Sequence, residues 1–493
     1  MSTRSKRYVI QLIVMLAIFV VVGMLLAAAM FFGTSDWRFQ LFVRSETVYI
    51  ILILAILIPA FMIVLTIGVH RRNKENANLP KHAVELAASV FPKVEEQMKQ
   101  AEEEYARSVQ EAFDALANPG SVKKADDEEE TERAPRFYML SDTDRRMAEF
   151  VAPEYDDEIR FDELCERFRN YCAGRMKLYY DIADIRRFIA SLTVTHLIVM
   201  QGMSGTGKTS LAYAFGEFLQ NQSTIVPIQP MWKERTDLIG YYNEFTKRFN
   251  ETVLLQKMYE ANYNREMYVT VLDEMNIARV EYYFAEFLSL LEIPDPNKRY
   301  LDVVSDKWDS DPVLLRNGQV KLPSNMWFMG TVNNDDSTFA ISDKVYDRAM
   351  VMNLDHKCEE FEPEEYVEAI KISADHWDRL TREAREDYAM TDRNERRIQK
   401  LDEYLIENFR ITFGNRIMKQ IRGYVPVCIA CGGEELDAID DILSKKVLRK
   451  LEAQNPVYVK SMADNLCNFL DELFGTDRMP LCKEYLRRLE RSA

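Results

Sequence analysis

The stretch "GMSGTGKT", from Gly202 to Thr209, fits the pattern G-x-x-x-x-G-K-[ST] at every fixed position. Its glycines let the backbone bend so that successive N–H groups face an anion, and a helix starting at its end adds partial positive charge. We expect Lys208 to reach the β- and γ-phosphates of a nucleoside triphosphate and the Thr209 hydroxyl to bind Mg²⁺. The residues predicted to contact the phosphates are Gly202, Met203, Ser204, Gly205, Thr206, Gly207, Lys208, Thr209 and Ser210.

Two further runs carry side chains that could complete a hydrolytic site. The run "MYVTVLDEMN" places Asp273 and Glu274 at the end of an apolar stretch. Asp273 is expected to hold the magnesium ion, and Glu274 to orient and polarise the attacking water. The run "NMWFMGTVNNDD" ends in Asn333 and Asn334, and we favour Asn333 as the amide that holds this water against Glu274.

The elements that position these residues are an apolar strand at 195–201 and the helix pattern that follows the glycine-rich loop. The two apolar runs that end in acids and amides are read as further strands of the same sheet. Residues 137–193 are mostly helical in pattern, and "LLRNGQVKLPSN" at 314–325 predicts a β-hairpin turning at Asn317-Gly318. After residue 355 the pattern is helical, with 413–421 and 436–452 as candidates for a small lid domain.

With these motifs the chain resembles an AAA+ ATPase of the MoxR/McrB-like group, over about 175–475. The stretch "LDEMNIARVEYYFAEFLSLLE" is similar to that group's strand with "DE-x-N" and its "LLE" helix end, and "GTVNNDDSTFAISDKVYDRAMVMNL" to its sensor-1 strand and arginine-bearing helix. The resemblance implies that Asn333 is the sensor-1 asparagine. It also implies that Arg348 is an arginine finger, although Asp347 and Ala349 flank it here and a salt bridge is the alternative.

The resemblance further implies an α/β fold, with a P-loop AAA+ domain in which helices flank a parallel sheet, and a helical C-terminal lid. Arg416 resembles a sensor-2 arginine that reaches the γ-phosphate, with a helix-end charge as the alternative. The expected cofactors are Mg²⁺ and ATP, with GTP left open. The aromatic and basic residues of "DLIGYYNEFTKRF" at 237–249 either touch a substrate or pack as a helix.

The expected function is a membrane-anchored ATPase that remodels an unidentified protein client, working as a ring with itself, expected to be a hexamer. Two alternatives stay open. One is a GTP-hydrolysing McrB-like motor subunit of a restriction or phage-defence complex, and the other is a nucleotide switch or scaffold without turnover. A formal net charge of −16 argues against direct nucleic-acid binding, which requires clustered Lys and Arg.

The N-terminal region has two uncharged apolar runs, at 8–32 and 48–69, each long enough to cross a bilayer. Lys and Arg are denser on their outer flanks, which predicts a two-pass membrane protein whose N-terminus and AAA+ domain face the cytoplasm. The lipid bilayer is then an expected partner. The scattered cysteines, including Cys428 and Cys431, are interpreted as reduced and structural.

These patterns predict six regions along the chain. They are a transmembrane hairpin at 1–74, a helical stalk at 75–116, a disordered acidic linker at 117–135, a helical part at 136–193, a nucleotide-binding core at 194–355 and a helical lid and C-terminal domain at 356–493.

Overall fold

The computed structural model describes residues 135–333, 338–355 and 357–492. These residues lie in one compact unit, Glu129–Ala493. The predicted transmembrane hairpin, the stalk and nearly all of the predicted linker fall outside the described residues.

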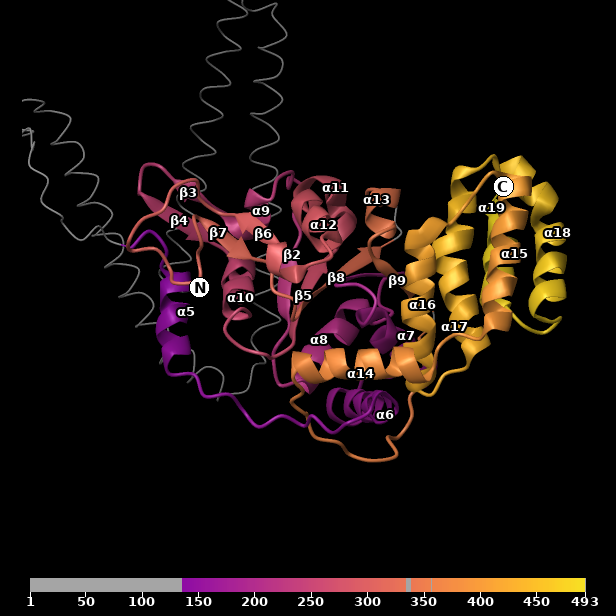
Figure 1. Cartoon of the computed structure of the whole chain (residues 1–493), viewed down its shortest axis with the longest axis horizontal. Coiled ribbons are helices and arrows are strands. Elements are labelled where there is room, and N and C mark those ends of the chain that lie inside the picture. The colour runs from indigo at the N-terminus through magenta and orange to yellow at the C-terminus, as the bar shows by residue number, and fades with distance from the viewer. Residues whose placement is uncertain (1–134, 334–337, 356, 493) are drawn as a thin grey trace, which may run out of the picture. The chain divides into compact units, whose positions relative to one another are not determined.

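A parallel five-stranded sheet forms the centre of this unit, as the sequence predicts (Figure 1). Its order is β2-β5-β8-β1-β9, and every neighbouring pair is parallel. The register sets Gly202 beside Asn333 and Gln201 beside Asn353, so the carboxyl ends of these strands meet at one edge. The strands are β1 (Leu197–Gly202), β2 (Thr224–Pro227), β5 (Tyr268–Asp273), β8 (Met326–Asn333) and β9 (Met350–Asn353).

Each face of the sheet is covered by helices, because alternate side chains of a buried strand point to opposite faces. On β1, Ile198 and Met200 join one hydrophobic core, and Leu197 and Val199 join the other. The first core includes α6 (Phe161–Tyr171), η2 (Cys172–Met176), α7 (Ile182–Leu192) and α8 (Lys208–Phe218). The second includes α5 (Met139–Ala148), α9 (Thr236–Ile239), α10 (Val253–Glu260), η3 (Met275–Ile277), α11 (Val280–Tyr283), α12 (Ala285–Glu292) and α13 (Asp343–Tyr346).

Two small antiparallel pairs project from the second side. One joins β3 (Gly240–Asn243) to β4 (Arg248–Glu251), and the other joins β6 (Tyr300–Asp302), which follows η4 (Pro296–Lys298), to β7 (Gln319–Lys321). The predicted turn at Asn317-Gly318 is present, with positive φ values of 52° and 75°. The hairpin itself differs from the prediction, since β7 pairs with the distant β6 and meets the preceding segment only at Arg316–Gln319.

The C-terminal region is helical, as predicted. Figure 1 shows α15 to α19 side by side as a bundle, whereas α14 lies across the core. Trp377 of α14 packs against Phe161, Phe215 and Trp327, so this helix belongs to the hydrophobic core beneath the sheet. The elements are α14 (Ala374–Asp387), α15 (Asp392–Phe409), α16 (Gly414–Ala430), α17 (Glu435–Ile442), η5 (Leu443–Val447), η6 (Leu448–Ala453), α18 (Pro456–Phe474) and α19 (Pro480–Ser492).

The predicted localisation needs correction. Across the described ranges, no helix has both the length and the apolar character needed to cross a bilayer. This finding contradicts the predicted two-pass membrane location. The bilayer as a partner stays a prediction. The runs at 8–32 and 48–69, on which the prediction was based, lie outside the described residues.

Candidate nucleotide-binding site

The glycine-rich loop connects β1 to the first turn of α8, in the order that a phosphate-binding loop requires. Gly205 and Gly207 have φ values of 81° and 89°, in the left-handed region that favours glycine. Gly202 is required for a second reason, because a Cβ there would lie 2.2 Å from the Leu354 carbonyl oxygen. The hydroxyl of Tyr180 donates a hydrogen bond to the Gly207 carbonyl (2.9 Å) and so fixes the end of the loop from outside.

Lys208 lies at the first residue of α8 with only 6% of its surface exposed. Its ammonium donates to the carbonyls of Gly202 (3.0 Å) and Met203 (2.7 Å), which closes the loop on itself. Burial lowers the pKa of Lys208, and the carboxylates of Asp355 and Asp273 oppose that shift. A cation held by two neutral carbonyls is well placed to exchange them for anionic phosphate oxygens.

Three oxygen-bearing side chains meet next to the loop. The hydroxyls of Thr209 and Thr331 both donate to Asp273 Oδ1, at 2.8 Å and 2.9 Å. Mg²⁺ favours oxygen ligands and is bound in nucleotide sites by one or two protein groups together with phosphate oxygens. Thr209 and Asp273, the predicted magnesium ligands, are therefore brought together and fit the ion. Thr331 was missed by sequence reasoning, although its place two residues before Asn333 on β8 puts it opposite Asp273.

Glu274 follows Asp273 with a φ of 52°, which turns its side chain out of the sheet at the strand end. Its backbone N–H donates to the Thr331 hydroxyl (2.8 Å), and its Oε1 accepts a hydrogen bond from the Asn333 amide (3.4 Å). The predicted pair of Glu274 and Asn333 is thus adjacent in space. The buried Asn276 donates to the carbonyl of Asn333 (3.0 Å) and supports it from behind. Sequence reasoning gave Asn276 no role, although the "DE-x-N" spacing contained it.

These side chains share one cavity of about 210 Å³ at the carboxyl edge of the sheet. It is lined by Ser204, Gly205, Gly207, Lys208, Thr209, Ser210, Asp273, Glu274, Thr331 and Asn333. Met203 and Thr206 shape the loop, since the Thr206 hydroxyl donates to the Met203 carbonyl (3.0 Å).

The two predicted arginines do not line this cavity. Arg348 donates to Glu292 at the end of α12 (2.7 Å) and to the Lys344 carbonyl (2.7 Å). Arg416, at the start of α16, forms an ion pair with the other oxygen of Glu292. One carboxylate therefore holds both arginines, and a contact of Arg416 with the γ-phosphate in the same chain stays a prediction.

Comparison with known proteins agrees with this geometry. Residues 197–349 match a family described as an AAA domain of the dynein-related subfamily. These residues form an AAA+ ATPase-like domain. Residues 367–493 match a second family, described as a domain of unknown function (DUF8727). No curated protein matches the chain.

Solved structures show likeness at low identity. A candidate ATPase from Cytophaga hutchinsonii aligns with a TM-score of 0.41 and 13% identity, over 64% of this chain and 91% of that one. A full-length MCM homologue from Methanopyrus kandleri aligns with a TM-score of 0.33 and 11% identity, over 60% of this chain and 63% of that one.

Proposed function

We propose that this chain is an AAA+ ATPase that couples hydrolysis of Mg-ATP to remodelling of a protein partner and works as a ring of identical subunits. The observation that carries the proposal is the convergence of Lys208, Asp273, Glu274 and Asn333 on one cavity beside the glycine-rich loop.

The hydrolytic step follows from the positions of these side chains. Backbone N–H groups of the loop and the Lys208 ammonium would bind the phosphates, and Thr209 and Asp273 would hold the metal. Magnesium, when bound, neutralises charge on the β- and γ-phosphate oxygens. Glu274 and Asn333 orient a water molecule between them. As the water oxygen bonds to the γ-phosphorus, the Glu274 carboxylate accepts one of its protons, and the bond from that phosphorus to the β–γ bridging oxygen breaks, so that ADP and inorganic phosphate leave. An intact carboxylate at this position favours turnover over a scaffold that only binds nucleotide.

The proposal of a ring rests on the positions of the two predicted arginines, which do not line the described cavity. Phosphoryl transfer develops negative charge that an added arginine stabilises. Neither Arg348 nor Arg416 lines the cavity of its own chain, so we propose that Arg348 acts on the nucleotide of a neighbouring subunit. A ring, expected to be a hexamer, supplies such a neighbour to every subunit.

The nucleotide preference is tested directly with the purified full chain. We expect the kcat/KM for phosphate release from Mg-ATP to exceed that from Mg-GTP by about tenfold, and Lys208→Ala to abolish both rates. Lys208 contacts the phosphates, which ATP and GTP share. Its removal is therefore expected to lower the rate of phosphate release equally for both nucleotides. A preference for GTP would replace our proposal with the McrB-like motor, and binding without phosphate release would leave only the switch.

An aromatic residue is exposed at the turn of the β3–β4 pair. Phe245 lies at the turn between these strands with 99% of its surface exposed, and Lys247 follows it. A fully exposed aromatic ring carries a cost in water that contact with a polypeptide would recover. We propose that the turn between β3 and β4, with Phe245, contacts the client.

Replacement of Phe245 separates client contact from hydrolysis. We expect an unfolded polypeptide such as casein to stimulate ATP hydrolysis of the wild type, and Phe245→Ser to lose that stimulation while the basal rate stays within about twofold. Tyr388→Ser, at the end of α14, is the matched control for loss of an exposed aromatic ring. Equal stimulation of wild type and Phe245→Ser would rule out this turn as the client contact.

A further inference from the structure

The segment that carries Arg348 is held by side chains from the C-terminal helices. We call residues 343–349 the finger segment; it comprises α13 and the turn leading to β9. Three backbone carbonyls of this segment, those of Tyr346, Asp347 and Ala349, accept hydrogen bonds from C-terminal side chains. These three carbonyls lie at and around the position of Arg348.

Lys446 of η5 makes two of these contacts. Its ammonium donates to the carbonyls of Tyr346 and Ala349 (2.6 Å to the latter), which lie on either side of Arg348 in the chain. The side chain is buried, with 5% of its surface exposed. Burial lowers the pKa of Lys446 to about 7, and Asp347 opposes the shift.

Two more side chains of the C-terminal region contact the finger segment. Gln420 of α16 donates to the Asp347 carbonyl (3.1 Å). Arg449 of η6 donates to the Asp343 carboxylate (2.9 Å) and stacks with its guanidinium carbon 3.4 Å from the centre of the Tyr346 ring. The contacts therefore fix both ends of the finger segment and its middle.

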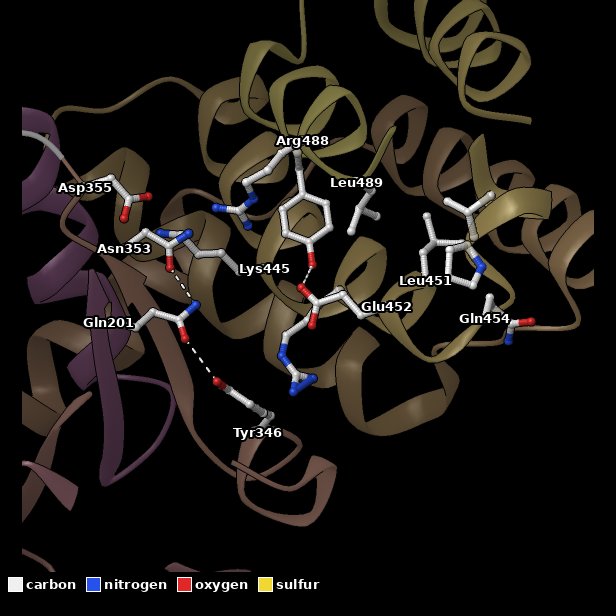
Figure 2. Close-up of a pocket in the computed structure, with 14 residues that line it drawn as sticks. Gln201, Tyr346, Asn353, Asp355, Lys445, Leu451, Glu452, Gln454, Arg488 and Leu489 are labelled. Atoms are coloured by element: carbon white, nitrogen blue, oxygen red, sulfur yellow. Dashed lines mark hydrogen bonds between the residues drawn. The ribbon is translucent and has the colours of Figure 1, made fainter. Parts of the chain in front are cut away.

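The finger segment is also tied to the strand that precedes the phosphate loop, through the Tyr346 hydroxyl. Figure 2 shows Tyr346 donating to Gln201 (3.0 Å), and Gln201 donating in turn to Asn353 of β9 (2.9 Å), at the mouth of a cavity of about 540 Å³ next to the C-terminal helices. The finger segment is thus tied both to the C-terminal helices and to β1. The Arg348 guanidinium, by contrast, is held by Glu292 and by the carbonyl of Lys344, neither of which belongs to the C-terminal helices.

From these contacts we infer that Lys446 is a positioning residue for Arg348: the C-terminal helices hold the finger segment where its arginine reaches the nucleotide of the neighbouring subunit. This inference rests on the proposed function of Arg348. The C-terminal helices would then govern the site of the next subunit while contributing no side chain to the cavity around their own phosphate loop.

The test uses mixed rings in which the two partners have different defects. A donor protomer carries Lys208→Ala, which disables its own site but leaves its Arg348 intact. An acceptor protomer carries Arg348→Ala and keeps a complete site of its own. Phosphate release by the mixture comes from acceptor sites completed by donor arginines.

Lys446→Met is then introduced into one partner at a time. In the donor, we expect it to lower the release by about tenfold or more, because a misplaced catalytic group loses rate steeply with distance. In the acceptor, whose own finger is already absent, we expect a change of less than about twofold. Lys450→Met in the donor is the matched control, since this neighbouring lysine donates only to the Thr412 carbonyl within the C-terminal region.

Comparing Lys446→Met in the donor with Lys446→Met in the acceptor distinguishes a positioning role of Lys446 from a general loss of structure. A structural defect would lower the release from either arm, so an equal decrease in both overturns the inference, as does an unchanged donor arm. Should Lys446→Met fail to fold, Gln420→Met in the donor removes the bond to the Asp347 carbonyl and is expected to give the same asymmetry. If donor and acceptor without further changes show no joint activity, the proposed role of Arg348 fails and this inference fails with it.

Discussion

Glu274→Gln protein is expected to bind Mg-ATP with the affinity of the wild type and to release phosphate about 10²- to 10⁴-fold more slowly. The amide keeps the size of the side chain and its contact with Asn333, but it cannot accept the proton of the attacking water. Phosphate binding depends on Lys208 and the loop, which the substitution leaves intact. Binding is measured by fluorescence of a labelled nucleotide, and hydrolysis by release of inorganic phosphate in single turnovers.

Glu217→Gln, on α8 but outside the cavity, is the control for the loss of a carboxylate as such. It is expected to hydrolyse ATP at the wild-type rate. Phosphate release by Glu274→Gln at the wild-type rate would show that Glu274 has no part in the mechanism. A loss of nucleotide binding would mean that Glu274 shapes the cavity and does not act on water.

Protomers with Lys208→Ala and protomers with Arg348→Ala are each expected to be nearly inactive, and a mixture of the two to recover activity. An arginine that acts from a neighbouring subunit is worth about 10³- to 10⁵-fold in rate, so even a minority of completed sites exceeds the background clearly. The recovered rate should follow the ratio of the two proteins and be greatest at intermediate mixing.

The control mixture combines Lys208→Ala with Glu274→Gln. Both residues line the same cavity of one chain, so no arrangement of these protomers completes a site. Recovery in that mixture would indicate exchange of something other than the arginine. Absence of recovery in the Lys208→Ala and Arg348→Ala mixture would show that Arg348 serves only as a salt-bridge partner of Glu292.

The sheet and the phosphate loop were predictable because their signals are local. The spacing of the loop glycines, the lysine and the threonine is specific for a phosphate-binding loop. The apolar runs before Asp273 and Asn333 are typical of buried parallel strands. Parallel strands bring their carboxyl ends to one edge, so the meeting of Glu274 and Asn333 followed once the strands were recognised.

The remaining contacts depend on register and on tertiary packing, which local patterns do not carry. Thr331 acts on Asp273 only because β8 lies beside β5 in one register. The partner of β7 is β6, which is distant in the chain. The shared pairing of Arg348 and Arg416 with Glu292 joins three segments that are distant in the chain, so no spacing in the sequence predicts it.

That shared carboxylate has a consequence for how readily Arg348 can leave it. Removing one member of an ion pair is expensive when the other is left without a counter-charge. Here Glu292 would keep Arg416 when Arg348 departs, and the carboxylate is partly open to water, with 34% of its side chain exposed. If Arg348 acts on a neighbouring subunit as proposed, Arg416 would remain as the counter-ion of Glu292, and the departure of Arg348 would leave no unpaired charge at this carboxylate.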